Sequence, residues 1–424
     1  MAAAVEIADP KLADAGVLRV EWAGNEMPAL ARITERFERE KPLAGTRIGA
    51  CLHITAETAN LVRALIAGGA EVAISASNPL STQDEVAAAL AQRYDARVFA
   101  VHGEDRAAYD RHIDAVCDIA PQITLDDGAD VIGALHGPRK ELLPGVLGGT
   151  EETTTGVIRL KALEREGTLA YPVIAVNEAQ TQHLFDTRYG TGQSTLDGIL
   201  RATNLLIAGR VVAVIGYGSC GKGVALRAKG LGANVLICEV DPLRALEAVM
   251  DGFTVLTGVE AAARADVIIT VTGNRDAVAG AMFDVMGDGT IVCNAGHFDI
   301  EINKSDLDSR AAARAEVRPL VERYTMSDER RIYLLAEGRL VNLSAAEGHP
   351  PAVMDMSFAN QALSVEHLVK NGAGLEPRIY PVPPAIDQTI ARLKLESLRV
   401  TIDELTEAQK SYLTSWDIMK GSDQ

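Results

Sequence analysis

The sequence predicts an α/β protein built from two doubly wound parallel-sheet domains that are joined by a hinge. Short apolar segments that end in Gly, Asp or Asn alternate with Ala-rich segments of helical spacing, which is typical of parallel sheets covered by helices. At 424 residues the chain is also too long for one hydrophobic core. Its 47% hydrophobic and 23% charged residues match the composition of a folded globular enzyme.

The first domain is predicted over residues 1–185. Helices such as the one expected over residues 58–67 separate its strands, and this alternation is typical of βαβ units. The first sheet is therefore expected to be parallel. Its strands are expected at residues 47–54, 71–77, 97–102 and 123–127.

The second domain is predicted over residues 190–348. Each of its apolar strands ends in a glycine or an acidic turn, and the period is again that of βαβ units. A helix-like stretch over residues 178–189, followed by the glycines of GTGQS, places one hinge before this domain. A second hinge is expected near residues 348–351. The strands lie in VVAVIGYG, NVLICEVD, DVIITVTG and GTIVCNAG.

The last part of the chain has helical spacing and a polar end. We expect residues 349–395 to return to the first domain and residues 396–424 to form a tail that contacts another subunit. The spacing alone is equally compatible with packing of this segment on a partner.

Charge and composition exclude several classes of function. A formal net charge of −17 repels phosphate backbones and anionic membranes, so no nucleic acid or membrane partner is expected. The amino terminus lacks the pattern of a secretory signal, and a cytoplasmic location is predicted. The five cysteines are interpreted as buried thiols in mostly strand-like contexts. The eight histidines show no metal-ligand spacing, and no catalytic metal is expected.

The segment GYGSCGKG predicts a dinucleotide site. It follows an apolar strand and precedes a helix, so Gly216 allows a tight turn, Gly218 lets the backbone approach a pyrophosphate, and Gly221 permits close packing of helix on strand. Glu239 ends the next strand, where a carboxylate binds the ribose diol and repels a 2'-phosphate, so NAD is favoured over NADP. Asp241 is the competing ribose partner. The structural alternative is a glycine turn without a ligand.

Polar residues also gather where strands of the first domain end. His53, Thr55 and Glu57 follow one strand, and Asp126 and Asp127 follow another. Ligands of parallel sheets bind at the carboxyl ends of the strands, so these groups are candidates for one cleft. Singly, each could instead be a turn or cap residue, and for Asp126 that interpretation is as good as a functional one.

Several ordered motifs make the sequence resemble the S-adenosylhomocysteine hydrolase family across nearly its whole length. The resemblance implies the family's two-domain fold, bound NAD, an adenine nucleoside substrate and a homotetramer. The ending LTEAQKSYLTSW resembles the shorter form of the family, which lacks the terminal Lys and Tyr that reach a neighbour's cofactor. The motifs are CLHITAETA, STQD, LDDGAD, EETTTG, GYGSCGKG with EVDP, CNAGHFD, LLAEGRLVNL and EGHP.

The resemblance also implies roles for individual residues. The family oxidises the 3'-carbon of the sugar with NAD, which acidifies the 4' proton; the 5' substituent then leaves, water adds, and the ketone is reduced again. Asp127 and His53 would handle the protons, with Glu152 and His297 on the leaving-group side. Glu57 would accept from the adenine amino group. Thr55 and His349 would also hold the nucleoside, and Thr153, Thr154, Thr155 and Asn342 would contact NAD.

For His297 and His349, a satisfied core or loop histidine is the structural alternative. Two positions depart from the family pattern. The family has Lys and Asn where this sequence has Gln182 and Thr187, while Asp186 is kept and can hold a sugar hydroxyl. The lysine accepts the hydroxyl proton during oxidation, and an amide cannot titrate.

Three hypotheses follow from this departure. The first is a specialised adenine nucleoside 4',5'-dehydratase, a lyase of the kind used in angustmycin-type antibiotic pathways. The second is the conventional hydrolase with a replaced base, for which His53, His183 or a water chain are candidates. The third is a regulatory protein that binds NAD and a nucleoside, which the retained His53, Asp127 and His297 disfavour.

Overall fold

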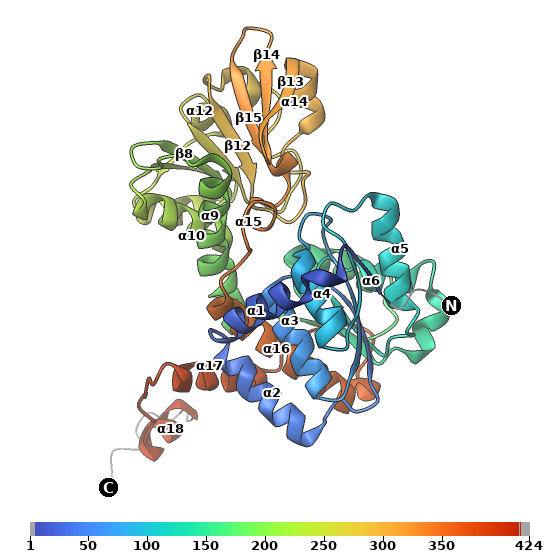
Figure 1. The fold of residues 1–424 in the computed structure, drawn as a ribbon. Coiled ribbons are helices and arrows are strands. Elements are labelled where there is room, and N and C mark those ends of the chain that lie inside the picture. Colours follow the sequence, from blue (N-terminus) through green and yellow to red (C-terminus); the bar gives the residue numbers. More distant parts are fainter. Residues whose placement is uncertain (1–4, 415, 417–424) are drawn as a thin grey trace.

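The computed structural model describes residues 5–414 and 416, which form two lobes with a tail at the carboxyl end (Figure 1). The lower lobe contains an eight-stranded sheet in the order β1-β4-β3-β2-β5-β6-β7-β16, and every neighbouring pair is parallel. Its strands are β1 (Glu6–Ile7), β2 (Arg47–Cys51), β3 (Glu71–Ser75), β4 (Arg97–Ala100), β5 (Ile123–Asp126), β6 (Gly148–Glu151), β7 (Val173–Ala175) and β16 (Ile379–Pro381).

Helices cover both faces of this first sheet. Buried apolar side chains from β2, β3 and β5 continue into those of α2, α3 and α16, so one core joins the sheet to the helices of one face. The helices are α1 (Ala13–Gly24), α2 (Pro28–Glu40), α3 (Ala56–Ala67), α4 (Asp84–Arg93), α5 (Arg106–Cys117), α6 (Asp130–His136), α7 (Thr154–Arg165), α16 (Pro351–Asn371) and α17 (Pro384–Ser397).

The upper lobe contains a second eight-stranded sheet, in the order β10-β9-β8-β11-β12-β15-β14-β13. In this order the first six strands, β10-β9-β8-β11-β12-β15, are parallel. The last two, β14 and β13, form an antiparallel extension at the edge. The strands are β8 (Val211–Ile215), β9 (Asn234–Cys238), β10 (Thr254–Val255), β11 (Val267–Thr270), β12 (Thr290–Asn294), β13 (Ala311–Arg318), β14 (Val321–Met326) and β15 (Arg331–Leu335).

The antiparallel edge corrects the expectation of parallel sheets throughout. Only two residues separate β13 from β14, with Leu320 at a φ of 64°, and so short a turn can only return the chain antiparallel. The helices of this lobe are α9 (Thr191–Thr203), α10 (Ser219–Gly230), α11 (Pro242–Met250), α12 (Gly258–Ala262), α13 (Ala281–Val285) and α14 (Lys304–Arg310).

The chain crosses between the lobes twice. The helix expected over residues 178–189 is broken into α8 (Gln180–His183) and a wide helical turn over Asp186–Gly190, which leads into α9. The second crossing follows α15 (Val341–Ser344) and ends where α16 begins. We place the limits of the two domains in these crossings.

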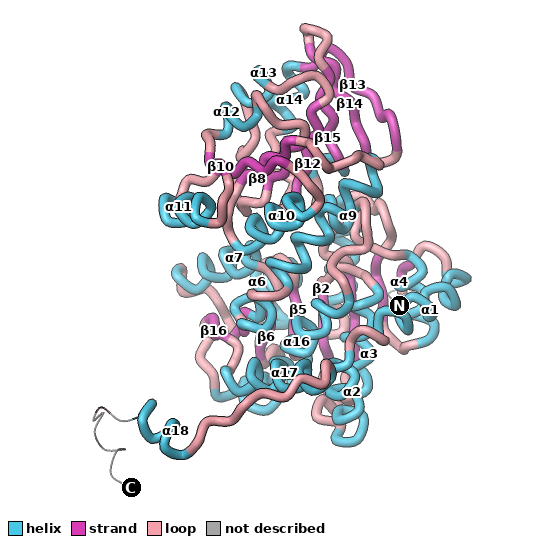
Figure 2. The backbone as a smooth tube through the Cα atoms, turned by 90° about the vertical axis from the view of Figure 1, so that its left-hand side faces the viewer, coloured by secondary structure: helices cyan, strands magenta, loops and turns pink. Residues whose placement is uncertain are grey.

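The returning segment is anchored to the first sheet by α16. Asp355 on this helix accepts hydrogen bonds from the backbone N–H groups of Ala29 and Leu30 and from Lys394 Nζ. One buried carboxylate therefore joins α2, α16 and α17. Beyond α17 the chain leads to α18 (Glu407–Thr414), which stands away from the body in both views (Figures 1 and 2).

The expected contexts of the cysteines are partly wrong. Cys51, Cys238 and Cys293 lie on strands and are buried as predicted, but Cys117 ends α5 and Cys220 lies in the first turn of α10. Cys220 is half-buried, and the loss of contact with water raises the pKa of its thiol to about 11. Among the described residues, no helix combines the length and the apolar character that crossing a membrane requires.

Candidate active site

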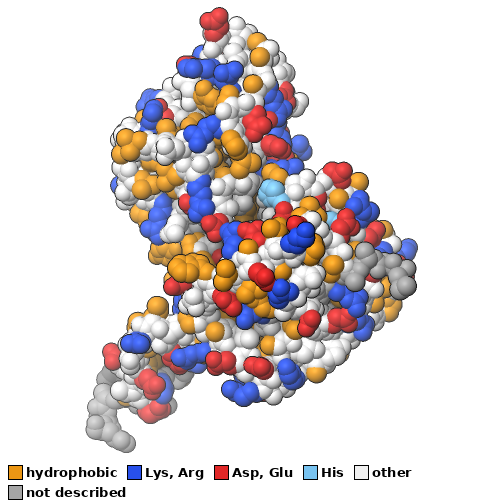
Figure 3. Space-filling view, in the orientation of Figure 1, with side chains coloured by type: hydrophobic (Ala, Val, Ile, Leu, Met, Phe, Trp, Pro, Cys, Tyr) orange, Lys and Arg blue, Asp and Glu red, His pale blue; other side chains and the backbone are white. Residues whose placement is uncertain are grey.

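The carboxyl ends of the first sheet's strands face the other lobe across a cleft. The segments after β2, β5 and β6 carry His53, Asp127 and Glu152, and the segment after β12 of the upper lobe carries His297. Histidine side chains are visible at the notch between the lobes (Figure 3). The cleft therefore collects residues from both sheets, as expected for parallel-sheet enzymes.

His53, Asp127 and His297 form the centre of this cluster. His53 Nε2 lies 3.1 Å from Asp127 Oδ2, and His297 Nδ1 lies 3.8 Å from Asp127 Oδ1. The two imidazole rings are 6.5 Å apart between centroids. The upper lobe thus places its histidine against an acid/base pair of the lower lobe.

Two serine hydroxyls contact Nδ1 of His53. Ser81 Oγ donates its proton to the carbonyl of Asn78 at 2.9 Å and lies 2.7 Å from His53 Nδ1, and Ser77 Oγ lies 3.1 Å from the same nitrogen. Because the Ser81 proton is already committed, Ser81 favours the tautomer with the proton on Nδ1, in which Nε2 is the acceptor that faces Asp127. Burial and the neighbouring His297 and His349 lower the pKa of His53 to about 3, so its ring is neutral.

Asp127 is the complementary proton donor. Burial, with the nearby Glu152 and Asp186 carboxylates, raises the pKa of Asp127 well above its usual range. Its Oδ1 is buried and has no hydrogen-bond partner among the described residues. Asp126, by contrast, accepts from the backbone N–H groups of Val131 and Ile132 at the start of α6, so it has the structural role of a cap.

Glu152 lies beside the two departures from the family pattern. Gln182 Nε2 donates to Glu152 Oε1 at 2.8 Å, and Ser357 and Gln361 of α16 also donate to this carboxylate. Thr187 is different, because its hydroxyl donates to the carbonyl of His183 and is therefore committed to the backbone of the hinge. The structure brings Gln182 into the cluster but gives the Thr187 hydroxyl no contact with it.

Asp186 and His349 form a second pair in the cleft. His349 Nδ1 hydrogen-bonds Asp186 Oδ1, and its Nε2 contacts Thr191 Oγ1 at 3.2 Å. Although burial alone would lower it, the Asp186 carboxylate raises the pKa of His349. The Asp186 carboxylate therefore favours the protonated form of the His349 imidazole.

A cavity of about 440 Å³ opens between α1, α9 and the second crossing. Glu57 lines it from the first turn of α3 and is 6% exposed, and burial raises the pKa of its carboxyl. Thr55 caps α3 by accepting from Thr58 N at 3.4 Å. Sequence reasoning missed Trp22 and Gln193 of this cavity, because one aromatic or amide residue on a helix carries no signal by itself.

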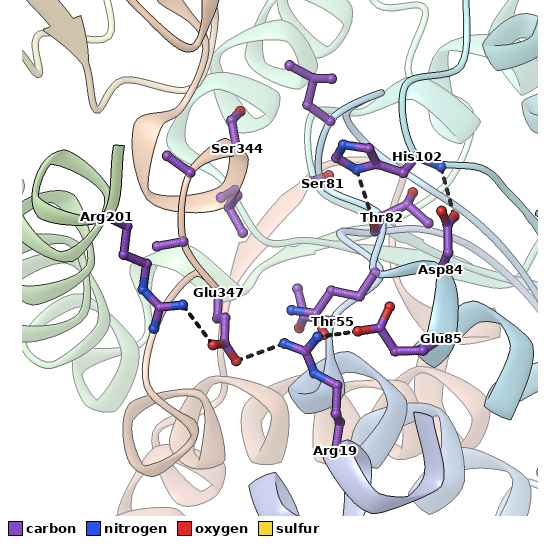
Figure 4. Close-up of a pocket in the computed structure, with 15 residues that line it drawn as sticks. Arg19, Thr55, Ser81, Thr82, Asp84, Glu85, His102, Arg201, Ser344 and Glu347 are labelled. Carbon is purple, nitrogen blue, oxygen red and sulfur yellow. Dashed lines mark hydrogen bonds and ion pairs between the residues drawn. The ribbon is translucent and has the colours of Figure 1, made fainter. Parts of the chain in front are cut away.

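An ionic chain crosses the neighbouring cavity, which also measures about 440 Å³ (Figure 4). Glu347 lies between Arg19 of α1 at 2.8 Å and Arg201 of α9 at 3.0 Å, and Arg19 also pairs with Glu85. These contacts connect the two lobes at the second crossing. These ion pairs were not expected from the sequence, because the residues that form them are far apart in it.

The glycine loop has the geometry expected of a dinucleotide site. Gly216 has a φ of 107°, and a Cβ on Gly221 would lie 2.1 Å from the Gly216 carbonyl oxygen. Glu239 directly follows β9 and accepts from the Tyr217 backbone N–H at 2.7 Å, which fixes it beside the loop. Asp241, the competing ribose partner, caps α11 by accepting from Leu243 N and Arg244 N.

The remaining predicted NAD contacts lie on both sides of the cleft. Asn342 donates to Ser194 Oγ at 3.2 Å, and its buried Oδ1 has no partner among the described residues. Thr153 caps α7 by accepting from the backbone N–H of Gly156, while Thr154 is exposed and accepts from Asn177; Thr155 lies in the same first turn. An orphaned acceptor and a glycine loop that has no room for a Cβ at Gly216 or Gly221 fit a bound nicotinamide dinucleotide.

Such a cleft defines a class of protein: a dinucleotide-dependent α/β enzyme that holds its substrate between two domains. Comparison with known proteins narrows the class to one family. The family model "S-adenosyl-L-homocysteine hydrolase" matches residues 4–143, and the model "S-adenosyl-L-homocysteine hydrolase, NAD binding domain" matches residues 187–348. The chain therefore belongs to the S-adenosyl-L-homocysteine hydrolase family, and NAD is its cofactor.

Relatives of high identity support the assignment over nearly the whole chain. Adenosylhomocysteinase of Aquifex aeolicus is 57% identical over 97% of this chain and 99% of its own length. Adenosylhomocysteinase of Gloeothece citriformis is 56% identical over 97% of this chain and 96% of its own. S-inosyl-L-homocysteine hydrolase of Methanopyrus kandleri is 53% identical over 97% of both chains. The predicted fold class, family and cofactor are confirmed.

Proposed function

We propose that the protein cleaves S-adenosylhomocysteine to adenosine and homocysteine. The observation that carries this proposal is the meeting of His53, Asp127 and His297 across the two domains of an NAD-dependent enzyme. Relatives named adenosylhomocysteinase at 52 to 57% identity support the same substrate class. Their similarity places this hypothesis ahead of the dehydratase that the sequence first favours.

Each residue of the cluster has a task in this reaction. NAD, when bound, supplies the oxidation of the sugar that makes the neighbouring C–H bond acidic. Asp127 and the neutral His53 would handle the proton at the 4'-carbon, because together they hold one proton in a buried, water-poor site. His297, which lies against Asp127 from the other domain, would exchange a proton with the departing 5' group.

A second candidate is the nucleoside 4',5'-dehydratase, which would eliminate water and not add it back. Gln182 favours this candidate, because the family's titratable lysine is absent from an otherwise complete cluster. A regulatory binding protein is the third candidate, and the intact acid/base cluster argues against it. All three keep the nucleoside and NAD but differ in their products.

A substrate panel separates these functions. The purified protein is incubated with S-adenosylhomocysteine, adenosine or a ketose adenine nucleoside, and the products are followed by mass spectrometry. Rapid release of homocysteine supports the hydrolase and eliminates the dehydratase. Loss of water from the ketose nucleoside without thioether cleavage supports the dehydratase and eliminates the hydrolase. Binding without any turnover supports the regulatory protein.

Glu57→Gln is expected to weaken the preference of the enzyme for an adenine over a hypoxanthine base. A carboxylate accepts from the adenine amino group, whereas an amide can donate to the carbonyl oxygen of hypoxanthine. The ratio of kcat/KM for the adenosyl and inosyl thioethers should fall by about 10- to 100-fold, because the hypoxanthine oxygen gains a donor that the wild-type carboxylate does not offer. A ratio that does not change would show that Glu57 does not contact the base.

We also propose that the enzyme is a homotetramer. α18 and the residues on either side of it expose Leu405, Tyr412, Leu413 and Trp416 to solvent in the isolated chain, and Trp416 is 92% exposed. Exposed aromatic and aliphatic side chains of this kind are typical of subunit contacts. Light scattering of the purified protein is expected to give four times the 45.0 kDa mass of the chain, and a monomer would contradict the proposal. The predicted tail includes residues 415 and 417–424, which lie outside the described residues.

A further inference from the structure

The Glu152 carboxylate is held by neutral hydrogen-bond donors. Gln182 Nε2 contacts its Oε1 at 2.8 Å, and the Ser357 hydroxyl and the Gln361 amide donate from one face of α16. Among residues 5–414, no lysine or arginine forms an ion pair with it. Its surroundings therefore stabilise a carboxylate without neutralising it.

Its proton affinity is suited to proton transfer at neutral pH. Burial raises the pKa of Glu152 to about 7, against the opposing effect of the hydrogen bonds from Ser357 and Gln361. The charged groups that face it are the Asp186 carboxylate, which favours the protonated form, and the His349 imidazole, which favours the ionised form. A general base is most effective when its pKa lies near the working pH.

The other groups near the hinge are already engaged. Asp186 is hydrogen-bonded to His349, and His53 holds Asp127 with its one free ring nitrogen. His183, a candidate base from the sequence, is exposed and its Nε2 contacts Ser219 Oγ of the glycine loop at 3.1 Å. Of the acidic and basic groups near the hinge, Glu152 is the one that contacts the Gln182 amide directly.

Gln182 itself offers an unused acceptor. The side chain is buried, its Nε2 is occupied by Glu152, and its Oε1 has no partner among the described residues. A buried amide oxygen without a donor is unfavourable, so a ligand hydroxyl is the group that would complete it. An amide in this position can therefore accept from one hydroxyl of a sugar diol and leave the neighbouring hydroxyl to the carboxylate that the amide also orients.

We propose that Glu152 is the proton acceptor for oxidation of the sugar hydroxyl, with Gln182 as its positioning residue. This assignment rests on the proposed function. The O–H bond breaks and its proton goes to a Glu152 oxygen; the electron pair of that bond forms the C=O double bond. The C–H bond on the same carbon breaks with its electron pair, which reduces NAD⁺. The proton returns to the sugar oxygen when the ketone is reduced at the end of the cycle.

Glu152→Gln tests the assignment with little change in shape. The rate of cofactor reduction after mixing with adenosine, followed by the absorbance of reduced nicotinamide, is expected to fall by about 10²–10⁴-fold. NAD content and the Kd for adenosine measured by calorimetry should stay close to those of the wild-type protein. These binding measurements show that the variant is folded and that the loss is chemical.

Ser357→Ala is the matched variant for the pH dependence. In the wild-type protein the reduction rate should rise with pH as Glu152 loses its proton, with a midpoint near 7. Loss of the Ser357 donor makes the carboxylate harder to ionise, so the midpoint should move up by about one pH unit. A purely structural role for Glu152 would lower the rate without moving the midpoint.

Gln182→Lys provides a gain-of-function arm. A lysine next to Glu152 supplies a titratable amine, so Gln182→Lys should raise hydrolysis and the double variant with Glu152→Gln should recover cofactor reduction. The assignment is overturned if Glu152→Gln reduces its cofactor as fast as the wild-type protein. Absence of cofactor reduction in the wild-type protein with every nucleoside tested would instead overturn the proposed function, and the assignment with it.

Discussion

Asp127→Asn is expected to stop the reaction after the sugar has been oxidised. Turnover should fall by about 10²–10⁴-fold, because an amide cannot exchange the proton that Asp127 shares with His53. The amide can still donate to His53 Nε2, so the geometry is retained. Reduced nicotinamide should therefore accumulate on the variant when adenosine is added, which its near-ultraviolet absorbance measures.

Asp126→Asn is the matched control for this variant. Asp126 is equally buried and adjacent, but its carboxylate accepts backbone N–H groups at the start of α6. We expect a lower melting temperature, from the loss of about 1 kcal/mol of capping, and turnover close to that of the wild-type protein. Equal loss of turnover in both variants would assign the effect to the buried charge and remove Asp127 from the chemistry.

Gly221→Ala is expected to abolish NAD binding. The new Cβ would lie 2.1 Å from the Gly216 carbonyl oxygen, so the start of α10 must move away from the turn that holds the pyrophosphate. Overpacking of this kind costs about 1–3 kcal/mol, and the displaced helix also loses its backbone contacts to the phosphates. The NAD content of the purified variant should be close to zero.

Gly230→Ala is the control in the same helix. No atom lies within 4 Å of a Cβ at Gly230, which ends α10, so only helix propensity changes. This variant should keep its NAD and be equally or slightly more stable, by about 0.5–1 kcal/mol. NAD retained in Gly221→Ala would contradict the close packing of helix on turn that the structure shows.

The glycine loop shows what a local pattern can predict. The positions of Gly216 and Gly221 follow from the contacts of a strand, a turn and a helix that are neighbours in the sequence, so spacing alone locates them. The same holds for β2, β3, β4 and β5 of the first sheet, which the sequence analysis predicted. The short strands β1, β6, β7 and β16 were missed, because EI, GGTE, VIA and IYP are too short or too polar to carry an apolar period.

Other parts of the site could not be located from local patterns. Ser357 and Gln361 lie more than 200 positions after Glu152 in the sequence, and only the return of α16 beneath the first sheet brings them to its carboxylate. Arg19 and Arg201 are likewise far apart in the sequence, and folding brings both to Glu347. A lone serine or arginine on a helix has no sequence signal that distinguishes it from a solvated surface residue.

The sequence by itself determined the alternation of strands and helices, the NAD site and the amino acids available for acid/base chemistry, since these depend on short-range spacing and on residue type. The tertiary structure decided which of those groups touch. It decided that Asp126 is a cap and Asp127 an acid, that Thr187 bonds the hinge backbone, and that Gln182 bonds Glu152. The physical reason is that burial and hydrogen-bond partners set the proton affinity of a side chain, and both are properties of distant segments brought together by folding.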